Sequence, residues 1–124
     1  MRILLIEPER RPEVREIDGS LKSMQETVGG YIQAIYPFED PVALVCGDEA
    51  KLQGLPLNRA LYEQGSRIPY DIIAGTFFLC GVEAEHFTSL TEELVLTYTE
   101  RFAMPELFLS LNGQIIAVPV KCIG

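Results

Sequence analysis

Short apolar runs separated by polar turn residues recur along the whole chain. Most of these runs are rich in Ile, Val, Leu and aromatic residues, and they are shorter than an ordinary helix, which is typical of β-strands. The run at 71–82 is the most hydrophobic, and we expect it to be a central strand covered on both faces of a sheet. The expected strands occupy 2–7, 13–17, 31–36, 42–46, 71–82, 107–111 and 114–118.

Two segments instead show the spacing of amphipathic helices. Asp18-Gly19-Ser20 predicts a helix start, and Gly29-Gly30 predicts its end. A capping box, Ser89-Leu-Thr-Glu92, predicts the start of a second helix. The apolar stripes expected to face the sheet are Leu21, Met24 and Val28 in the first helix, and Leu90, Leu94, Tyr98 and Phe102 in the second.

Asn112-Gly113 is the clearest local signal in the chain, because it lies between the apolar runs 107–111 and 114–118. This residue pair suits a type I′ turn, so the pattern predicts a C-terminal β-hairpin. Both strands are apolar on both faces, and we expect the parent sheet or another subunit to cover them. The element order predicts a single α+β domain over 1–124, with a mostly antiparallel sheet, two helices and this hairpin. We expect a core at 1–102 and the hairpin at 106–120.

The net charge of the chain and the lengths of its apolar runs argue against nucleic acids and membranes as partners. The chain has 124 residues and a net charge of −8, with its basic residues scattered rather than clustered. Direct nucleic-acid binding is therefore not expected, because it needs clustered Lys and Arg. The apolar runs are too short for a signal peptide or a membrane span, which predicts a cytoplasmic protein.

The cysteines and the histidine do not form a metal-binding pattern. Cys46, Cys80 and Cys122 are an odd number without a CxxC pair, and we expect buried, reduced thiols. His86 is the only histidine, and it lies in a polar, surface-like segment. We therefore expect no metal site and no cofactor.

Asn58 and Arg59 are the strongest candidates for ligand binding. They follow Gly54 and Pro56, which restrict the backbone, and they place an amide beside a guanidinium. Such a pair can bind a nucleotide-like ligand. An alternative interpretation is that Asn58 caps a short helix and that Arg59 is solvated. The sequence leaves both open.

Further candidates supply the other contacts that a nucleotide needs. Arg101 is a possible phosphate partner, although it also suits the C-terminal end of a helix. Thr76 is a lone hydroxyl in an apolar run, which bonds either a carbonyl or a ligand. Possible stacking surfaces are Tyr31, Tyr36 and Phe78, the last of which also suits core packing. No nucleophile elbow, Walker loop or dinucleotide fingerprint is present, so we expect a protein that is not an enzyme.

Five short motifs, in order, carry a resemblance to a known family. They are Glu16-Ile-Asp-Gly-Ser20, Val28-Gly-Gly-Tyr-Ile32, Gly54-Leu-Pro-Leu-Asn-Arg59, Asp71-Ile-Ile-Ala-Gly-Thr-Phe-Phe78 and Ser89-Leu-Thr-Glu92. Over its first 102 residues the chain resembles small proteins of phages and mobile elements of gut-type bacteria, known only as a domain of unknown function. The hairpin lies beyond this resemblance.

In length and α+β character the chain is also similar to the Thoeris anti-defence sponges. This resemblance implies a homo-oligomer in the host cytosol that sequesters a cyclic nucleotide or cyclic ADP-ribose signal without cleaving it. An alternative function is an acidic protein-binding inhibitor, of the DNA-mimic or antirestriction type, acting on a host defence protein.

Overall fold

The computed structural model describes residues 1–121 and is built around one antiparallel sheet. Cys122 lies outside the described residues. Five strands follow the order β2-β1-β7-β4-β3. The sixth strand, β8, pairs with β7 and is not part of this linear order. Their bounds are β1 (Arg2–Ile6), β2 (Glu13–Glu16), β3 (Ile32–Ile35), β4 (Val42–Gly47), β7 (Phe77–Glu83) and β8 (His86–Thr88). The prediction of an α+β domain with mostly antiparallel pairing is confirmed.

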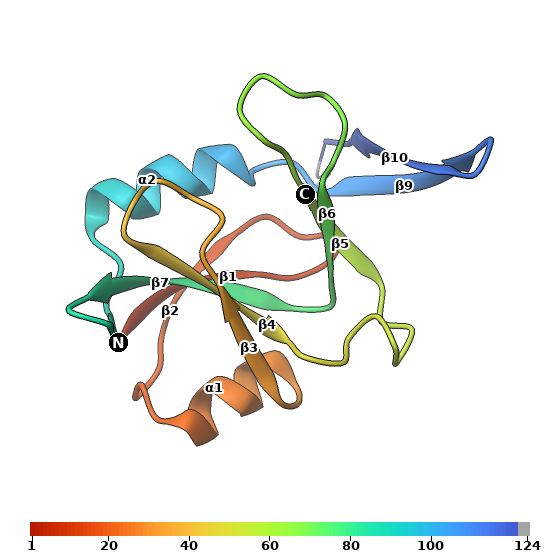
Figure 1. Ribbon diagram of the computed structural model, residues 1–124. Coiled ribbons are helices and arrows are strands. Elements are labelled where there is room, and N and C mark those ends of the chain that lie inside the picture. Colours follow the sequence, from red (N-terminus) through yellow and green to blue (C-terminus); the bar gives the residue numbers. More distant parts are fainter. Residues whose placement is uncertain (122–124) are drawn as a thin grey trace.

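Two helices cover opposite faces of this sheet, α1 (Leu21–Val28) on one side and α2 (Glu92–Arg101) on the other (Figure 1). Neighbouring residues of β7 point to these two faces. Phe77 packs with Tyr98 on the side of α2, whereas Phe78 packs with Met24 on the side of α1. The strand β7 is therefore covered on both faces, as the sequence predicts.

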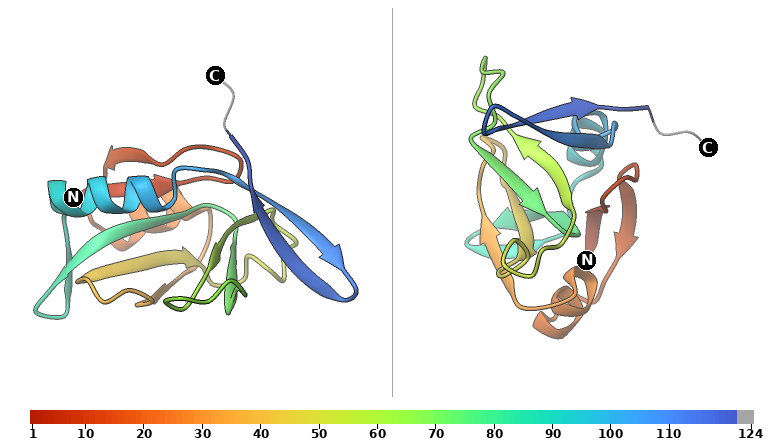
Figure 2. Two further views of the ribbon diagram at one scale, coloured as in Figure 1. Left: turned by 90° about the horizontal axis from the view of Figure 1, so that it is seen from above. Right: turned by 90° about the vertical axis from the view of Figure 1, so that its right-hand side faces the viewer.

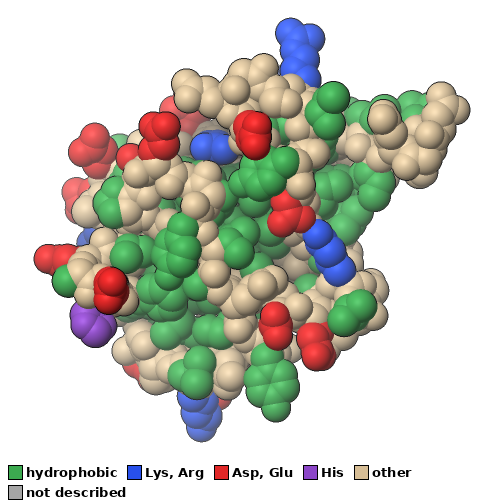
Figure 3. Space-filling view, in the orientation of Figure 1, with side chains coloured by type: hydrophobic (Ala, Val, Ile, Leu, Met, Phe, Trp, Pro, Cys, Tyr) green, Lys and Arg blue, Asp and Glu red, His purple; other side chains and the backbone are tan. Residues whose placement is uncertain are grey.

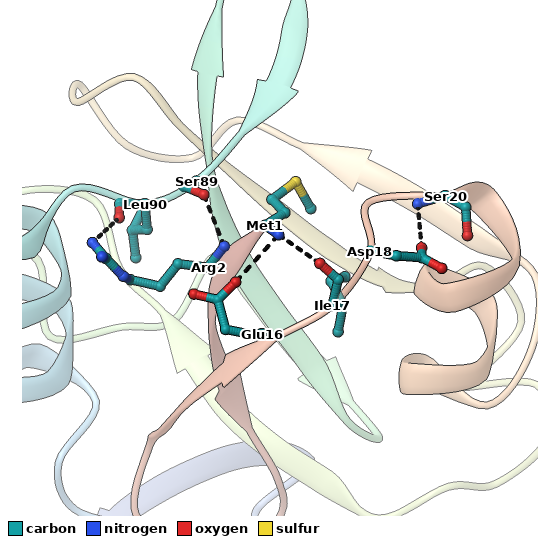
Figure 4. Close-up of polar contacts among 8 residues, drawn as sticks. All are labelled: Met1, Arg2, Glu16, Ile17, Asp18, Ser20, Ser89 and Leu90. Atoms are coloured by element: carbon teal, nitrogen blue, oxygen red, sulfur yellow. Dashed lines mark hydrogen bonds and ion pairs between the residues drawn. The ribbon is translucent and has the colours of Figure 1, made fainter.

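The ends of α1 agree with the sequence, but the start of α2 does not. Ser20 caps α1 by accepting a hydrogen bond from the Ser23 N–H, and Gly29 ends it with a left-handed φ of 91°. The predicted capping box at Ser89 is wrong, because Thr91 is the N-cap of α2. The Ser89 hydroxyl instead accepts a hydrogen bond from the Arg2 N–H and ties β1 to the helix entry (Figure 4).

The expected helix stripes are confirmed except at one position. Leu90, Tyr98 and Phe102 are buried in the core, and Leu94 packs against it. Met24 and Val28 are buried as predicted, but Leu21 is 60% exposed. Leu21 is the first residue of α1 and lies outside the stripe that meets the sheet.

The predicted strand at 71–82 is two strands. β6 (Asp71–Ala74) is followed by Gly75, which has a φ of 72°, and β7 begins at Phe77. β6 pairs with β5 (Leu57–Leu61) in a separate two-stranded sheet. The sequence did not predict β5, because Gly54 and Pro56 just before it and Asn58 within it are typical of turns.

The C-terminal hairpin is confirmed, with β9 (Glu106–Leu111) and β10 (Gln114–Pro119) joined by Asn112-Gly113. Both turn residues have positive φ, 50° and 80°, as a type I′ turn requires. The hairpin projects away from the rest of the domain (Figure 2). The cover that its apolar composition predicts is therefore not supplied in full by the described part of this chain.

Candidate functional site

Asn58 and Arg59 lie on a β-bulge in β5. The pairing with β6 shifts between Leu57 and Arg59, so Asn58 is the extra residue. A bulge re-aims side chains that would otherwise alternate between the two faces of a strand. The two side chains consequently contact each other, with the Arg59 Nη1 donating to the Asn58 Oδ1 at 2.8 Å.

The Asn58 amide connects three backbone segments. Its Nδ2 donates to the carbonyl of Ile6 at 2.9 Å and to the carbonyl of Gly75 at 2.8 Å. These contacts join the end of β1 to the turn between β6 and β7. Asn58 is completely buried, so its hydrogen bonds are made inside the protein.

The Arg59 guanidinium binds backbone carbonyls from two distant elements. Its Nη2 donates to Arg10 at 2.6 Å and to Phe102 at 3.1 Å. Phe102 is the C-cap of α2, where carbonyls lack partners within the helix. Arg59 is only 1% exposed, and it therefore joins the β1–β2 turn to the end of α2.

These positions change both sequence interpretations of the pair. The helix-cap interpretation with a solvated Arg59 is wrong, because both residues are buried in a strand. The ligand-binding interpretation requires groups that reach a ligand, whereas both side chains here bind the protein's own backbone. The pair acts as a structural clamp between β1, β5 and α2.

Glu106 extends this clamp to the base of the hairpin. Its Oε1 accepts a hydrogen bond of 2.7 Å from the Ala60 N–H, next to Arg59 in β5. Burial raises the pKa of the Glu106 carboxyl, while the Ala60 N–H and the Arg59 charge act in the opposite direction. The first strand of the hairpin is thus attached through a carboxylate whose charged form is disfavoured by burial.

Replacing Glu106 by Gln is expected to flatten the pH dependence of stability. An acid with a raised folded-state pKa stabilises the fold most below its ordinary pKa, and this contribution is lost as the pH rises through the raised value. The free energy of unfolding of Glu106→Gln relative to wild type should therefore increase as the pH rises through that window. Urea denaturation at several pH values measures the difference.

The matched variant Glu106→Ala removes the acceptor as well as the charge. It leaves the Ala60 N–H without this partner, which should cost about 1–3 kcal/mol. Equal stabilities of the Gln and Ala variants would contradict a role for the Glu106–Ala60 hydrogen bond.

The other candidate residues do not converge on one site. Phe78 is completely buried in the core, and Thr76 is half-buried in the link between β6 and β7. Tyr31 lines a cavity of about 300 Å³ at the end of α1. Tyr36 is 61% exposed and lies outside the linings of the described cavities.

Arg101 lies at a larger hollow, of about 850 Å³, beside the end of α2. Its guanidinium is 4.8 Å from the centre of the Phe38 ring, a cation–π distance. The sequence did not predict that other aromatic residues line this hollow, because they come from α2 and from the loop between β5 and β6, which are far apart in the chain. They are Tyr62, Tyr70 and the buried Tyr98.

One face of the hairpin is an exposed aliphatic surface. Leu107 pairs with Val118 and Leu109 pairs with Ile116, so the alternation of strand side chains places them on the same face. We call this surface the hairpin face. Its residues, between 38% and 53% exposed, are Leu107, Leu109, Leu111, Ile116 and Val118.

Residues 1–121 contain neither a membrane-spanning helix nor a cluster of metal-ligating side chains. No helix in this range has the length and apolar character needed to cross a membrane. Within the same residues, no three His, Cys, Asp or Glu side chains gather in a group that could hold a metal ion.

Comparison with known proteins identifies a family but not an activity. No curated protein matches the chain significantly. No solved structure matches it significantly either. The chain belongs to the family described as "Domain of unknown function (DUF3846)", whose model matches residues 1–103 and ends before the β9–β10 hairpin.

Proposed function

We propose that this protein is a binding protein without catalytic activity, which self-associates through its hairpin and acts on a protein partner. The observation that carries this proposal is the hairpin face. Five aliphatic side chains on one face of a projecting hairpin are a typical protein-contact surface. Covering them with protein removes apolar surface from water, which is the main driving force of association.

A second copy of the chain is the first partner that this surface suits. Residues 107–120 contain no charged residue, although the whole chain has a net charge of −8. Two copies that meet through this segment do not place like charges directly against each other, which reduces the repulsion between two acidic molecules. A two-fold arrangement would place the same face against itself, as in most homodimers.

The target that we propose is a protein with a basic surface. The −8 charge favours such a partner by electrostatic attraction and disfavours nucleic acids. In the phage setting that the sequence motifs imply, the target would be a host defence protein and this chain its inhibitor. Burial of the Asn58–Arg59 pair supports this function over one that depends on the pair for phosphate binding.

A second candidate function is sequestration of a cyclic nucleotide or cyclic ADP-ribose signal. Arg101 favours it, because its guanidinium lies with several aromatic rings at the hollow of about 850 Å³. A phosphate would bind Arg101, and a base would stack on a ring. The carboxylates around this hollow oppose a phosphate, so this remains the second candidate.

One purification separates the two functions. Tagged protein is expressed in defence-active bacterial cells and isolated at low salt, and both the co-purified proteins and the small molecules released by heat are identified by mass spectrometry. We expect a stoichiometric protein partner that binds again when both proteins are purified separately. An unchanged nucleotide at one equivalent, with no protein partner, would support sequestration instead.

A further inference from the structure

The hollow beside α2 combines aromatic rings with an excess of carboxylates. It lies between the β3–β4 loop, the β5–β6 loop and the C-terminal end of α2. In Figure 1 the first loop is the orange segment drawn across α2, and the second is the green segment that rises near the C-terminal end of α2. We call this hollow of about 850 Å³ the aromatic cleft. It is large enough for several side chains of a partner.

The aromatic side of the cleft is held in place by packing. The rings of Phe38 and Tyr98 lie 4.7 Å apart, and the Tyr98 hydroxyl donates to the Asp40 Oδ2 at 2.8 Å. Burial, together with the hydrogen bond and charge of Asp40, raises the pKa of Tyr98 above its ordinary range, so its hydroxyl remains a donor. Tyr70 is 51% exposed at the cleft and offers a ring to solvent.

The charges of the lining favour a positive ligand. Three carboxylates, Glu39, Asp40 and Glu63, face one guanidinium, that of Arg101. Arg101 already contacts the Phe38 ring, at 4.8 Å from its centre. Acidic and basic side chains lie near one another over this part of the surface (Figure 3). A phosphate entering the cleft would meet more negative than positive charge.

We propose that the aromatic cleft binds the cationic side chain, Arg or Lys, of a basic segment in the partner protein. Aromatic faces attract cations, and flanking carboxylates add a charge-assisted hydrogen bond to the same group. The contact between Arg101 and Phe38 shows that a guanidinium fits over a ring at this place. This inference rests on the proposed function, since it names the part of the protein partner that is recognised.

The test uses a tetra-arginine peptide and its neutral analogue, tetra-citrulline, in calorimetric titrations of the full chain. We expect the arginine peptide to bind and the citrulline peptide to bind at least about tenfold more weakly, since citrulline lacks the charge. The double variant Glu39→Gln/Glu63→Gln should weaken arginine-peptide binding by a similar factor, and Tyr70→Ala should also weaken it.

A matched variant controls for the overall charge. Glu26→Gln/Glu83→Gln also removes two negative charges, but from exposed positions outside the cleft, and it should leave binding of the arginine peptide nearly unchanged. If both double variants weakened arginine-peptide binding equally, the peptide would be attracted by the total charge of the protein, and the cleft site would be overturned. Absence of arginine-peptide binding would overturn it as well.

The outcomes also separate this inference from the proposed function. A cyclic nucleotide that binds the cleft and depends on Arg101, without arginine-peptide binding, would overturn the inference and favour sequestration. A protein partner recovered from cells whose binding is insensitive to Glu39→Gln/Glu63→Gln would overturn the cleft inference alone. A protein that stays monomeric and recovers no partner would overturn the proposed function, even if the peptide bound the cleft.

Discussion

Replacing Arg59 by Ala is expected to destabilise the fold by roughly 3–5 kcal/mol, because several buried hydrogen bonds disappear together. The carbonyls of Arg10 and Phe102 lose the guanidinium that they accept from, and the Asn58 Oδ1 loses its partner. A domain of ordinary stability has only about 5–15 kcal/mol in total. Urea denaturation followed by circular dichroism measures the change in the free energy of unfolding.

Two further variants make the Arg59 experiment specific. Arg59→Lys keeps the charge but lacks the planar set of donors. We therefore expect it to lower the free energy of unfolding by less than Arg59→Ala does. Arg101→Ala removes an exposed arginine near the same helix end and should cost about 1 kcal/mol or less. If Arg59→Ala and Arg101→Ala have equal effects, the clamp between β1, β5 and α2 does not contribute as its contacts predict.

Placing a charge on the hairpin face is expected to weaken self-association strongly while leaving the fold intact. Leu109→Glu or Ile116→Glu would bury a carboxylate in the contact between two copies. Loss of a central contact residue commonly costs about 2 kcal/mol or more, which corresponds to roughly thirtyfold weaker binding. Sedimentation velocity over a range of concentrations measures the shift towards the 13.9 kDa monomer.

Ser110→Glu is the matched control for the hairpin face. It adds the same charge to the same strand, but Ser110 lies on the opposite face of the hairpin and is exposed. We expect its association to remain close to that of wild type. A wild-type protein that is monomeric at micromolar concentration would contradict self-association through the hairpin. If Ser110→Glu weakened association as much as the variants of the hairpin face, the contact would lie elsewhere.

Local signals in the sequence determined the elements that depend mainly on neighbouring residues. Asn112-Gly113 predicted the hairpin because few residue pairs adopt two consecutive positive φ angles. Ser20 and Gly29 predicted the ends of α1 because a cap is formed within a few residues. The apolar stripe of α2 and the two-sided burial of Phe77 and Phe78 followed from periodicity.

The predicted cap of α2 and the predicted continuous strand at 71–82 were wrong, because both depend on more than the neighbouring residues. Ser89 and Thr91 are both residue types that can cap a helix, but Thr91 caps α2, and the Ser89 hydroxyl accepts a hydrogen bond from the N–H of Arg2, a residue far away in the chain. The break between β6 and β7 depends on Gly75, whose positive φ is not evident within a continuous apolar run.

The sequence by itself determined the fold class, the hairpin and the acidic character of this protein, because these depend on local conformational preference and composition. Only the tertiary structure decided the roles of the buried polar residues Asn58 and Arg59. A bulge turned Asn58 and Arg59 inward, where carbonyls from Ile6, Arg10 and Phe102 bind them. The loops around α2 brought Phe38, Tyr62 and Tyr70 to one cleft. Such groupings arise from contacts between residues far apart in the chain, and periodicity and spacing carry no information about them.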